Sequence, residues 1–352
     1  MTKIGSVSLA PPFGVAPMAG MTDTAFRRLV KLQGGCGLVV TEMVSSEGLV
    51  RGIDRTLEYA EYTEEERPVS IQIFGGDPAK MADAAQIVEK MGADVVDVNM
   101  GCPVPKIAKN QAGCALMKEP EQAARIIRAV SRAVKIPVTV KMRAGWNDKQ
   151  LNAGTVARMV QDAGAAAVTI HGRTAAQSYS GLADWDLVSR VASDLEIPVI
   201  GSGDCTEPEH IVDRLITGVD GVVVGRGVLR NPWILAQAYD LIMGRAPRTV
   251  TREMRGEFLL EYIDLLLGDQ SREDRGFRHH APTATDDVAT QRPAFGREKW
   301  VINKLRALNA WYSKGYEGGA QFRIAINHCH SIAELRDHID AFFFADTQAT
   351  VA

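Results

Sequence analysis

The sequence predicts a (β/α)8 TIM barrel, an α/β fold, followed by a small all-helical domain. Three observations support this. Eight short apolar runs follow one another between residues 14 and 227, helical patterns fill most of the gaps between them, and the strand pattern stops after about residue 245. Runs that are rich in Val and Ile throughout are typical of parallel strands buried on both faces. We therefore expect a barrel in residues 1–245 and a helical domain in residues 246–352.

The predicted strands are the eight apolar runs, in chain order: "GVAPMA" (14–19), "LVVTEM" (38–43), "VSIQIFG" (69–75), "VVDVNMG" (95–101), "PVTVKMR" (137–143), "AVTIHGR" (167–173), "IPVIGSG" (197–203) and "GVVVGRG" (221–227). Their spacing is about one βα unit each. The gap 77–93 shows the helical pattern well, with a start at Asp77-Pro78 and a stop at Gly92. A doubly wound open sheet is the competing architecture. Its first strand should lead into a Gly-rich dinucleotide fingerprint, and "APMAGMTD" (16–23) does not match one.

Three amphipathic segments predict the helical domain: 253–268, 300–315 and 331–344. The second ends at Gly315, and the third begins with Ser331 and Glu334 at the spacing of a capping box. Residues 269–298 are polar with almost no aliphatic side chains, so we expect a flexible insertion there.

Composition excludes several classes of protein. No apolar run approaches the roughly 18 residues of a membrane span, and the N-terminus has no signal-peptide pattern. Five cysteines without a CxxC pair argue against a disulfide framework and against a zinc or iron–sulfur site. We expect a cytoplasmic monomer with no metal and no membrane contact. The net charge of −3 is not that of a general polyanion binder. The segment 292–323 is basic, however, with seven Lys/Arg and only two acidic residues.

The active site of such a barrel forms at the C-terminal ends of its strands. The strand ends hold Pro17-Met18-Ala19, Glu42, Gln72, Asn99 and Cys102, Lys141 and Arg143, His171 and Arg173, Gly203-Asp204, and Gly225-Arg226, and most of them carry polar or charged side chains. Glycine-rich loops after strands seven and eight favour a phosphate, because their N–H groups can approach an anion closely. Lys141 and Gln72 would suit the polar edge of a flat heteroaromatic ring, and a lysine stabilises the negative charge of a reduced flavin.

Cys102 lies in "NMGCPVPK" (99–106), directly after a predicted strand. Pro103 and Pro105 restrict the backbone of this turn. A thiol with an ordinary pKa of about 8.5 is mostly protonated near neutral pH and can act as a general acid. The turn would hold that acid in one place.

These motifs together resemble the tRNA-dihydrouridine synthases, most closely their bacterial B subgroup. The matching segments are "APMAGMTDTAFR" (16–27), "VSIQIFG" (69–75), "DVVDVNMGCPVPKI" (94–107), "VTVKMRAGW" (138–146), "TIHGRTAAQSYSG" (169–181) and "DGVVVGRGVLRNPWI" (220–234). "AWYSKG" (310–315) is similar to part of the family's RNA-contacting domain.

The resemblance implies an FMN enzyme that uses NADPH, or NADH, to reduce the carbon 5–carbon 6 double bond of uridine in tRNA. It implies Cys102 as proton donor. The cofactor-binding residues would be Pro17, Met18, Ala19, Gln72, Lys141, His171, Ser202, Gly203, Asp204, Gly225 and Arg226. Where relatives usually read Asn-Gly-Asp, this chain has Ser202, which can still donate a hydrogen bond.

Substrate contacts follow from the same resemblance. Asn99 and Arg143 would meet the uracil, and a basic, aromatic helix at 299–314 would face tRNA through Lys299, Lys304 and Arg306. Two other functions fit part of the sequence. A flavin barrel that reduces a small pyrimidine or an enone needs no basic tail, and a catalytically idle tRNA-binding protein needs no Cys102 or Lys141.

Overall fold

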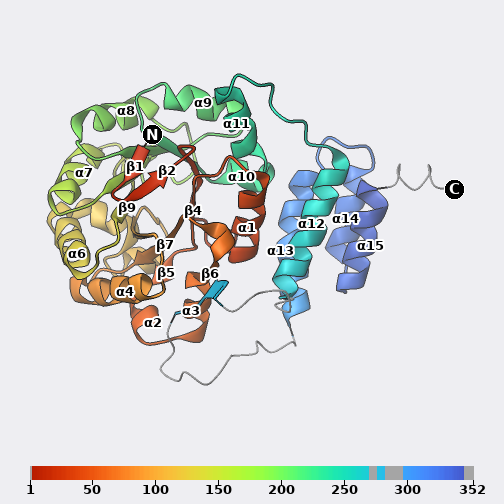
Figure 1. Cartoon of the computed structure of the whole chain (residues 1–352), viewed down its shortest axis with the longest axis horizontal. Helices are drawn as coiled ribbons and strands as arrows, with labels where there is room; N and C mark the ends of the chain where they lie inside the picture. The colour runs from red at the N-terminus through yellow and green to blue at the C-terminus, as the bar shows by residue number, and fades with distance from the viewer. Residues whose placement is uncertain (1, 269–275, 282–295, 345–352) are drawn as a thin grey trace.

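The computed structural model describes residues 2–268, 276–281 and 296–344. Its centre is a closed barrel of eight parallel strands (Figure 1). In chain order they are β3 (Phe13–Val15), β4 (Leu38–Val40), β7 (Val69–Phe74), β8 (Val95–Met100), β9 (Val138–Arg143), β10 (Ala167–His171), β11 (Val199–Ser202) and β12 (Gly221–Val224). Each pairs with the next, and β12 returns to β3. The predicted TIM barrel and all eight of its predicted strands are confirmed.

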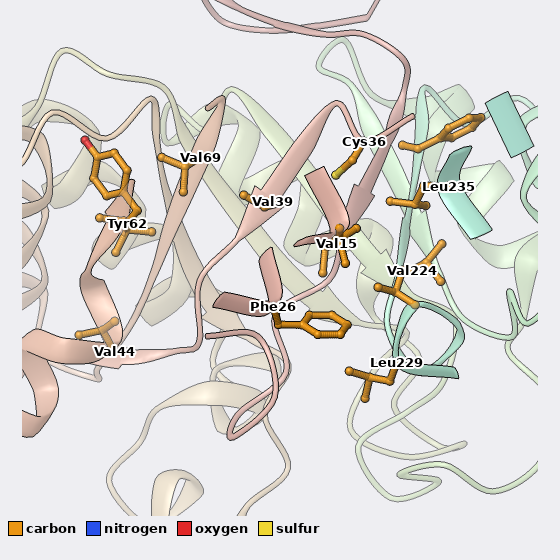
Figure 2. Close-up of a cluster of buried hydrophobic side chains, with 14 of the residues drawn as sticks. Val15, Phe26, Cys36, Val39, Val44, Tyr62, Val69, Val224, Leu229 and Leu235 are labelled. Atoms are coloured by element: carbon orange, nitrogen blue, oxygen red, sulfur yellow. The ribbon is translucent and has the colours of Figure 1, made fainter. Parts of the chain in front are cut away.

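Helices surround the strands (Figure 1). Their apolar side chains pack against those of the strands in one buried cluster. The helices are α1 (Thr24–Gln33), α4 (Pro78–Lys90), α6 (Pro120–Ala133), α7 (Ala153–Asp162), α8 (Trp185–Asp194), α9 (Pro208–Leu215) and α11 (Ile234–Ile242), with the short α2 (Ser46–Val50), α3 (Asp54–Ala60), α5 (Pro105–Ala108) and α10 (Arg226–Arg230) between them. Figure 2 shows part of this layer, where Val15, Val39 and Val224 of the barrel lie near Phe26 of α1 and Leu229 of α10. All of these side chains are buried.

A hairpin that the sequence reading missed covers the N-terminal end of the barrel. Strand β1 (Thr2–Ile4) pairs with β2 (Val7–Leu9) in an antiparallel register. Ile4 and Leu9 pack in one buried cluster with Leu38 and Val95, the first residues of two barrel strands. The site must therefore open at the other end.

Within the described residues, four helices follow the barrel: α12 (Arg252–Leu267), α13 (Arg297–Tyr312), α14 (Gly319–His328) and α15 (Ile332–Phe343). The three predicted helices are confirmed, although α13 ends at Tyr312 rather than Gly315. At the start of α15, the hydroxyl of Ser331 accepts from the Glu334 N–H, as the capping-box spacing predicted. Helix α14 was not predicted, because it starts after a left-handed Gly318 with no side-chain cap.

The helical region shares a core with the barrel. The Phe258 ring of α12 lies 6.2 Å from that of Phe26, 5.5 Å from that of Trp233 and 5.8 Å from that of Tyr312, between ring centroids. Figure 1 shows α12 and α13 beside the barrel helix α1. The domain boundary at residue 245 remains a prediction. None of the described helices has both the length and the hydropathy of a membrane span.

Most of the predicted insertion, residues 269–275 and 282–295, lies outside the described residues. The described part contains β13 (Arg278–His279), which pairs with β6 (Tyr62–Thr63) on the barrel. The ring of His279 stacks on Tyr62 with centroids 4.5 Å apart. This piece of the segment is therefore attached to the barrel surface.

Candidate active site

A cavity of about 770 Å³ opens at the C-terminal ends of the barrel strands. Every residue that the sequence reading placed at the barrel mouth as catalytic, cofactor-binding or substrate-binding lines it: Pro17, Met18, Ala19, Gln72, Asn99, Cys102, Lys141, Arg143, His171, Ser202, Gly203, Asp204, Gly225 and Arg226. The size is that of an ordinary cofactor or substrate pocket. The three basic residues predicted on the tail do not line it.

The turn that carries Cys102 is held from both sides. The Asn99 side-chain oxygen accepts from the backbone N–H groups of Gly101 (3.2 Å) and Cys102 (3.0 Å). The Cys102 carbonyl accepts from the Cys114 N–H at 3.0 Å. Gly113 has φ +60°, and a Cβ there would lie 2.8 Å from the Cys102 oxygen, so this close approach requires glycine. The thiol therefore has a defined position.

Cys102 is the one thiol of the five that is not buried. Partial burial nevertheless raises its pKa, against the lowering effects of the Val104 backbone and the Arg143 charge. The thiol, not the thiolate, is the form present at neutral pH. This is the protonation state that an acid needs and a nucleophile does not.

A buried carboxylate, Asp97 of β8, lies beneath the floor of the cavity. It accepts from the amide nitrogen of Gln72 (2.6 Å) and from the hydroxyl of Thr139 (2.6 Å). Burial raises its pKa, and its two hydrogen-bond donors oppose that effect. The sequence reading took "VVDVNMG" (95–101) as an apolar run and did not assign Asp97 to the site.

Lys141 lies next to Asn99, its register partner on the neighbouring strand. Burial lowers the pKa of the Lys141 ammonium to about 8, and the charge of Arg143 adds to the effect while Asp97 opposes it. Lysine so tuned can gain or lose a proton near neutral pH.

Arg143 is buried, and two of its three nitrogens donate to backbone oxygens. Its Nε donates to Gly101 (2.8 Å), and Nη1 donates to Thr174 and Ser178 (3.0 Å each). The side chain ties the Cys102 turn to the loop after β10. This arrangement was not visible in the sequence, which suggested only a contact with substrate.

His171, at the end of β10, is neutral. Burial lowers the pKa of its ring to about 2, with Lys141 and Arg143 as the next causes. Its Nδ1 accepts from the Arg173 N–H at 3.2 Å, so the proton of the neutral ring is on Nε2. A Cβ placed on Gly203 would lie 3.8 Å from that Nε2. His171 therefore presents a hydrogen-bond donor beside the glycine-rich rim.

The loops after β11 and β12 form that rim. Gly203 has φ +131°, and a Cβ on it would lie 2.6 Å from the Cβ of Ala183. Arg226 begins α10, is 43% exposed, and lies 4.5 Å from the centroid of the Tyr179 ring. An exposed guanidinium beside such backbone suits an anion.

The Asp204 carboxylate lies in this rim, and its hydrogen bonds go to other groups of the protein. It accepts from the guanidinium of Arg173 (2.7 Å) and from the Ala183 N–H (2.7 Å). These contacts hold its pKa below the usual range despite partial burial. Arg173 was seen at a strand end in the sequence but not included in the predicted site. Its Nη1 is buried without a partner, although its other nitrogens are bonded.

The basic face expected on helix 299–314 is corrected by the structure. Lys299 is exposed, but the Lys304 side chain is 5% exposed and pairs with Asp23 of the barrel. Arg306 donates to the backbone oxygens of Ile326 and Cys329, near the C-terminus of α14. The prediction of an exposed cation is wrong for Lys304, because its place in the helical period faces the barrel.

Comparison with known proteins agrees with the motifs at this site. The family model described as Dihydrouridine synthase (Dus) matches residues 14–346. The chain belongs to the dihydrouridine synthase family. The resemblance stated from the motifs is thereby confirmed.

Two relatives illustrate the extent of the similarity. A protein named probable tRNA-dihydrouridine synthase from Rickettsia bellii is 36% identical over 346 residues, covering 97% of this chain and 98% of its own length. A protein named tRNA-dihydrouridine synthase B from Shewanella oneidensis is 41% identical over 280 residues, covering 78% of this chain and 86% of its own. The similarity thus includes both the barrel and helical residues after it.

Proposed function

We propose that this protein is a tRNA-dihydrouridine synthase, an oxidoreductase that converts uridine in tRNA to 5,6-dihydrouridine. FMN is the proposed cofactor, NADPH or NADH the electron donor, and Cys102 the proton donor. The observation that carries the proposal is one cavity in which a protonated thiol on a fixed turn lies with a half-buried lysine and a glycine-rich, basic rim. The names of the relatives supply the substrate.

The residues present fit a phosphate-bearing flavin. Gly203 and Gly225 leave backbone unobstructed at the rim, and Arg226 adds an exposed guanidinium for the phosphate. The neutral His171 offers an Nε2–H donor nearby. Pro17, Met18 and Ala19 follow β3, the neighbour of β12, and give the wall beside Gly225 an uncharged surface on which a flat ring can lie. When bound and reduced, FMN supplies the hydride for one carbon of the uracil double bond.

Lys141 then has an electrostatic role. Its ammonium is the positive group on the cavity floor, and its lowered pKa reflects the cost of burying that charge. A negative charge on a neighbouring ring would relieve this cost. Lys141 would therefore favour the reduced, anionic form of the cofactor over the oxidised form.

Cys102 completes the reaction by delivering a proton to the second carbon of the double bond. Its raised pKa keeps the proton on sulfur until the carbon becomes basic. The contacts of the turn with Asn99 and Cys114 limit its movement, and a misplacement of about 1 Å can cost about a hundredfold in rate.

A uridine inside folded tRNA must be extruded to reach the barrel mouth. The described tail offers Lys299 and the 45% exposed Trp300 as surface groups. We keep Lys299 as a proposed contact with the tRNA backbone. Arg306 is proposed only as a partial contact, since two of its nitrogens already donate to backbone oxygens and the third donates to the Asn303 side chain.

The test is a single-turnover measurement with Cys102→Ala. Enzyme loaded with FMN is reduced without oxygen, unmodified tRNA is added, and flavin reoxidation is followed near 450 nm. Loss of a general acid should slow this step by about 10²–10⁴-fold, while FMN content and reduction by NADPH stay unchanged. Cys114→Ala is the matched control, because this neighbouring thiol does not line the cavity. Wild-type rates in Cys102→Ala would assign the proton to another group. Failure of the wild type to form dihydrouridine would reject the proposed activity.

A further inference from the structure

A chain of hydrogen bonds connects the buried Asp97 carboxylate to the backbone of Cys102. The Gln72 amide nitrogen donates to Asp97 at 2.6 Å. The Gln72 amide oxygen accepts from the Asn99 amide nitrogen at 2.7 Å. The Asn99 oxygen in turn accepts from the Cys102 N–H at 3.0 Å and the Gly101 N–H at 3.2 Å. Two side chains, Gln72 of β7 and Asn99 of β8, thus lie in series between the Asp97 carboxylate and the thiol-bearing turn.

The direction of every bond in this chain is determined from the Cys102 end. A backbone N–H can only donate, so Asn99 must turn its oxygen to Cys102 and its nitrogen to Gln72. Gln72 must then offer its oxygen to Asn99 and its nitrogen to Asp97. The group at position 97 must therefore accept. An ionised carboxylate can only accept, so Asp97 is matched to this requirement.

Water cannot easily replace a link of this chain. Asp97, Gln72 and Asn99 are 4%, 1% and 7% exposed. Gln72 and Asp97 are register partners on β7 and β8, and Thr139 of β9 holds the other oxygen of Asp97 at 2.6 Å. A buried amide without its acceptor costs about 1–3 kcal/mol and adopts other rotamers where it can.

We propose that Asp97 is a positioning residue for Cys102 and acts through the side chains of Gln72 and Asn99. The inference rests on the proposed function for its meaning, since it concerns the group that would deliver the proton. Without an acceptor at position 97, the Gln72 amide loses its preferred orientation. Asn99 is then no longer held with its oxygen toward Cys102, and the turn loosens.

The experiment compares three variants that alter the chain in different ways. Asp97→Ala removes the acceptor. Asp97→Asn keeps an oxygen for Gln72, and its nitrogen can donate to the Thr139 hydroxyl, which can also accept. Thr139→Val removes only the hydrogen bond from the Thr139 hydroxyl to Asp97 and leaves the bond between Gln72 and Asp97 in place. Each is purified without FMN, treated with iodoacetamide at pH 7.5, and analysed by peptide mass spectrometry for all five cysteines.

A loosened turn exposes the Cys102 thiol and releases the burial that raises its pKa. Asp97→Ala should therefore be alkylated at Cys102 about tenfold faster, as one pKa unit would give. The same variant, loaded with FMN, should be reoxidised by tRNA about a hundredfold more slowly, as expected for a displaced acid. Asp97→Asn and Thr139→Val should stay within a few-fold of wild type in both measurements.

Several results would overturn the proposal. Wild-type alkylation in Asp97→Ala would show that the turn does not depend on position 97. Equal effects in Asp97→Asn would assign the role to charge, and equal effects in Thr139→Val would indicate general loosening. Faster alkylation of Cys36, Cys205 and Cys329 as well would indicate global opening.

A second variant and the choice of readout keep the outcome decisive. If Asp97→Ala does not fold, Gln72→Met breaks the chain one link closer to the thiol and should give the same faster alkylation. Unchanged alkylation in that variant would overturn the proposal. The alkylation requires neither FMN nor RNA. An inactive wild type would therefore reject the proposed function, while the pattern across the variants would still decide the role of Asp97.

Discussion

Replacing Lys141 by methionine should make the protein more stable at neutral pH while removing a group that the proposed reaction needs. The reason is the position of the half-buried Lys141 side chain on the wall of the cavity, where the surrounding protein removes most of its water. Burial there lowers its pKa from the ordinary 10.5 to about 8. In the unfolded chain the same ammonium is fully hydrated. Folding therefore forces a charge into a place that disfavours it, and methionine carries no charge.

The magnitude follows from the shift. A difference of 2.5 between the two pKa values, at about 1.4 kcal/mol per unit, gives about 3 kcal/mol of destabilisation below pH 8. Between pH 8 and pH 10.5 the unfolded state binds more protons than the folded state, so wild-type stability rises with pH in this window. The stability advantage of Lys141→Met should accordingly shrink by about 2 kcal/mol between pH 7 and pH 9.5.

Urea unfolding of both proteins without FMN, at pH 7, 8 and 9.5, measures this difference. Effects of other titrating groups cancel, because they are common to both chains. Lys299→Met is the control, since Lys299 is an exposed lysine and its replacement should leave the pH profile unchanged. A constant difference between wild type and Lys141→Met across the three pH values would refute the account of a destabilised ammonium.

Three further outcomes are expected. The His171 ring is neutral, with a pKa of about 2, so its contribution to FMN binding is that of an uncharged hydrogen-bond donor. His171→Gln keeps a donor and should bind FMN within a few-fold of wild type, whereas His171→Leu should bind it at least tenfold more weakly. Titration of FMN binding between pH 5 and pH 8 should show no step attributable to this ring. Gly203→Ala should cost about 1–3 kcal/mol in urea unfolding and weaken FMN binding, because φ is +131° and the added methyl has no room. Lys304→Met should cost about 1–3 kcal/mol in unfolding, because Asp23 loses its buried ion-pair partner but keeps the Phe26 N–H and the Tyr262 hydroxyl as donors. Lys299→Met should change stability by less than about 0.5 kcal/mol.

The barrel could be predicted from sequence because its signal is local and repeated. A strand buried on both faces has to be apolar along most of its length, and each of the eight runs meets that condition. The cavity residues were found for a related reason: strand ends in this architecture meet at one rim, so polar groups that follow apolar runs can be assigned to one place. Neither inference needs any knowledge of side-chain contacts.

What the sequence could not give depends on partners distant in the chain. Asp97 reads as one polar residue in an apolar run, and its role depends on Gln72 and Thr139 of the neighbouring strands. Lys304 reads as part of a basic helix, and only the docking of α13 shows that it faces Asp23. The terminal hairpin was missed because each of its strands has only three residues, too few for a periodic pattern.

The contact between Lys304 and Asp23 also bears on how the tail is oriented relative to the cavity. Asp23 caps α1 by accepting from the Phe26 N–H at 2.9 Å, and it accepts from the Tyr262 hydroxyl of α12 at 2.8 Å. The loop just before it contains Met18, a lining residue of the cavity. Rotation of the helices about the preceding linker would break this buried pair and expose the shared aromatic core around Phe258, at a cost of several kcal/mol. The helices are thus held at a set orientation to the barrel mouth. A tRNA that bound both the helices and the barrel mouth would have to match the spacing between them for its uridine to reach the cavity. Its recognition would then depend on the shape of the folded RNA, which is how folded RNA is commonly recognised.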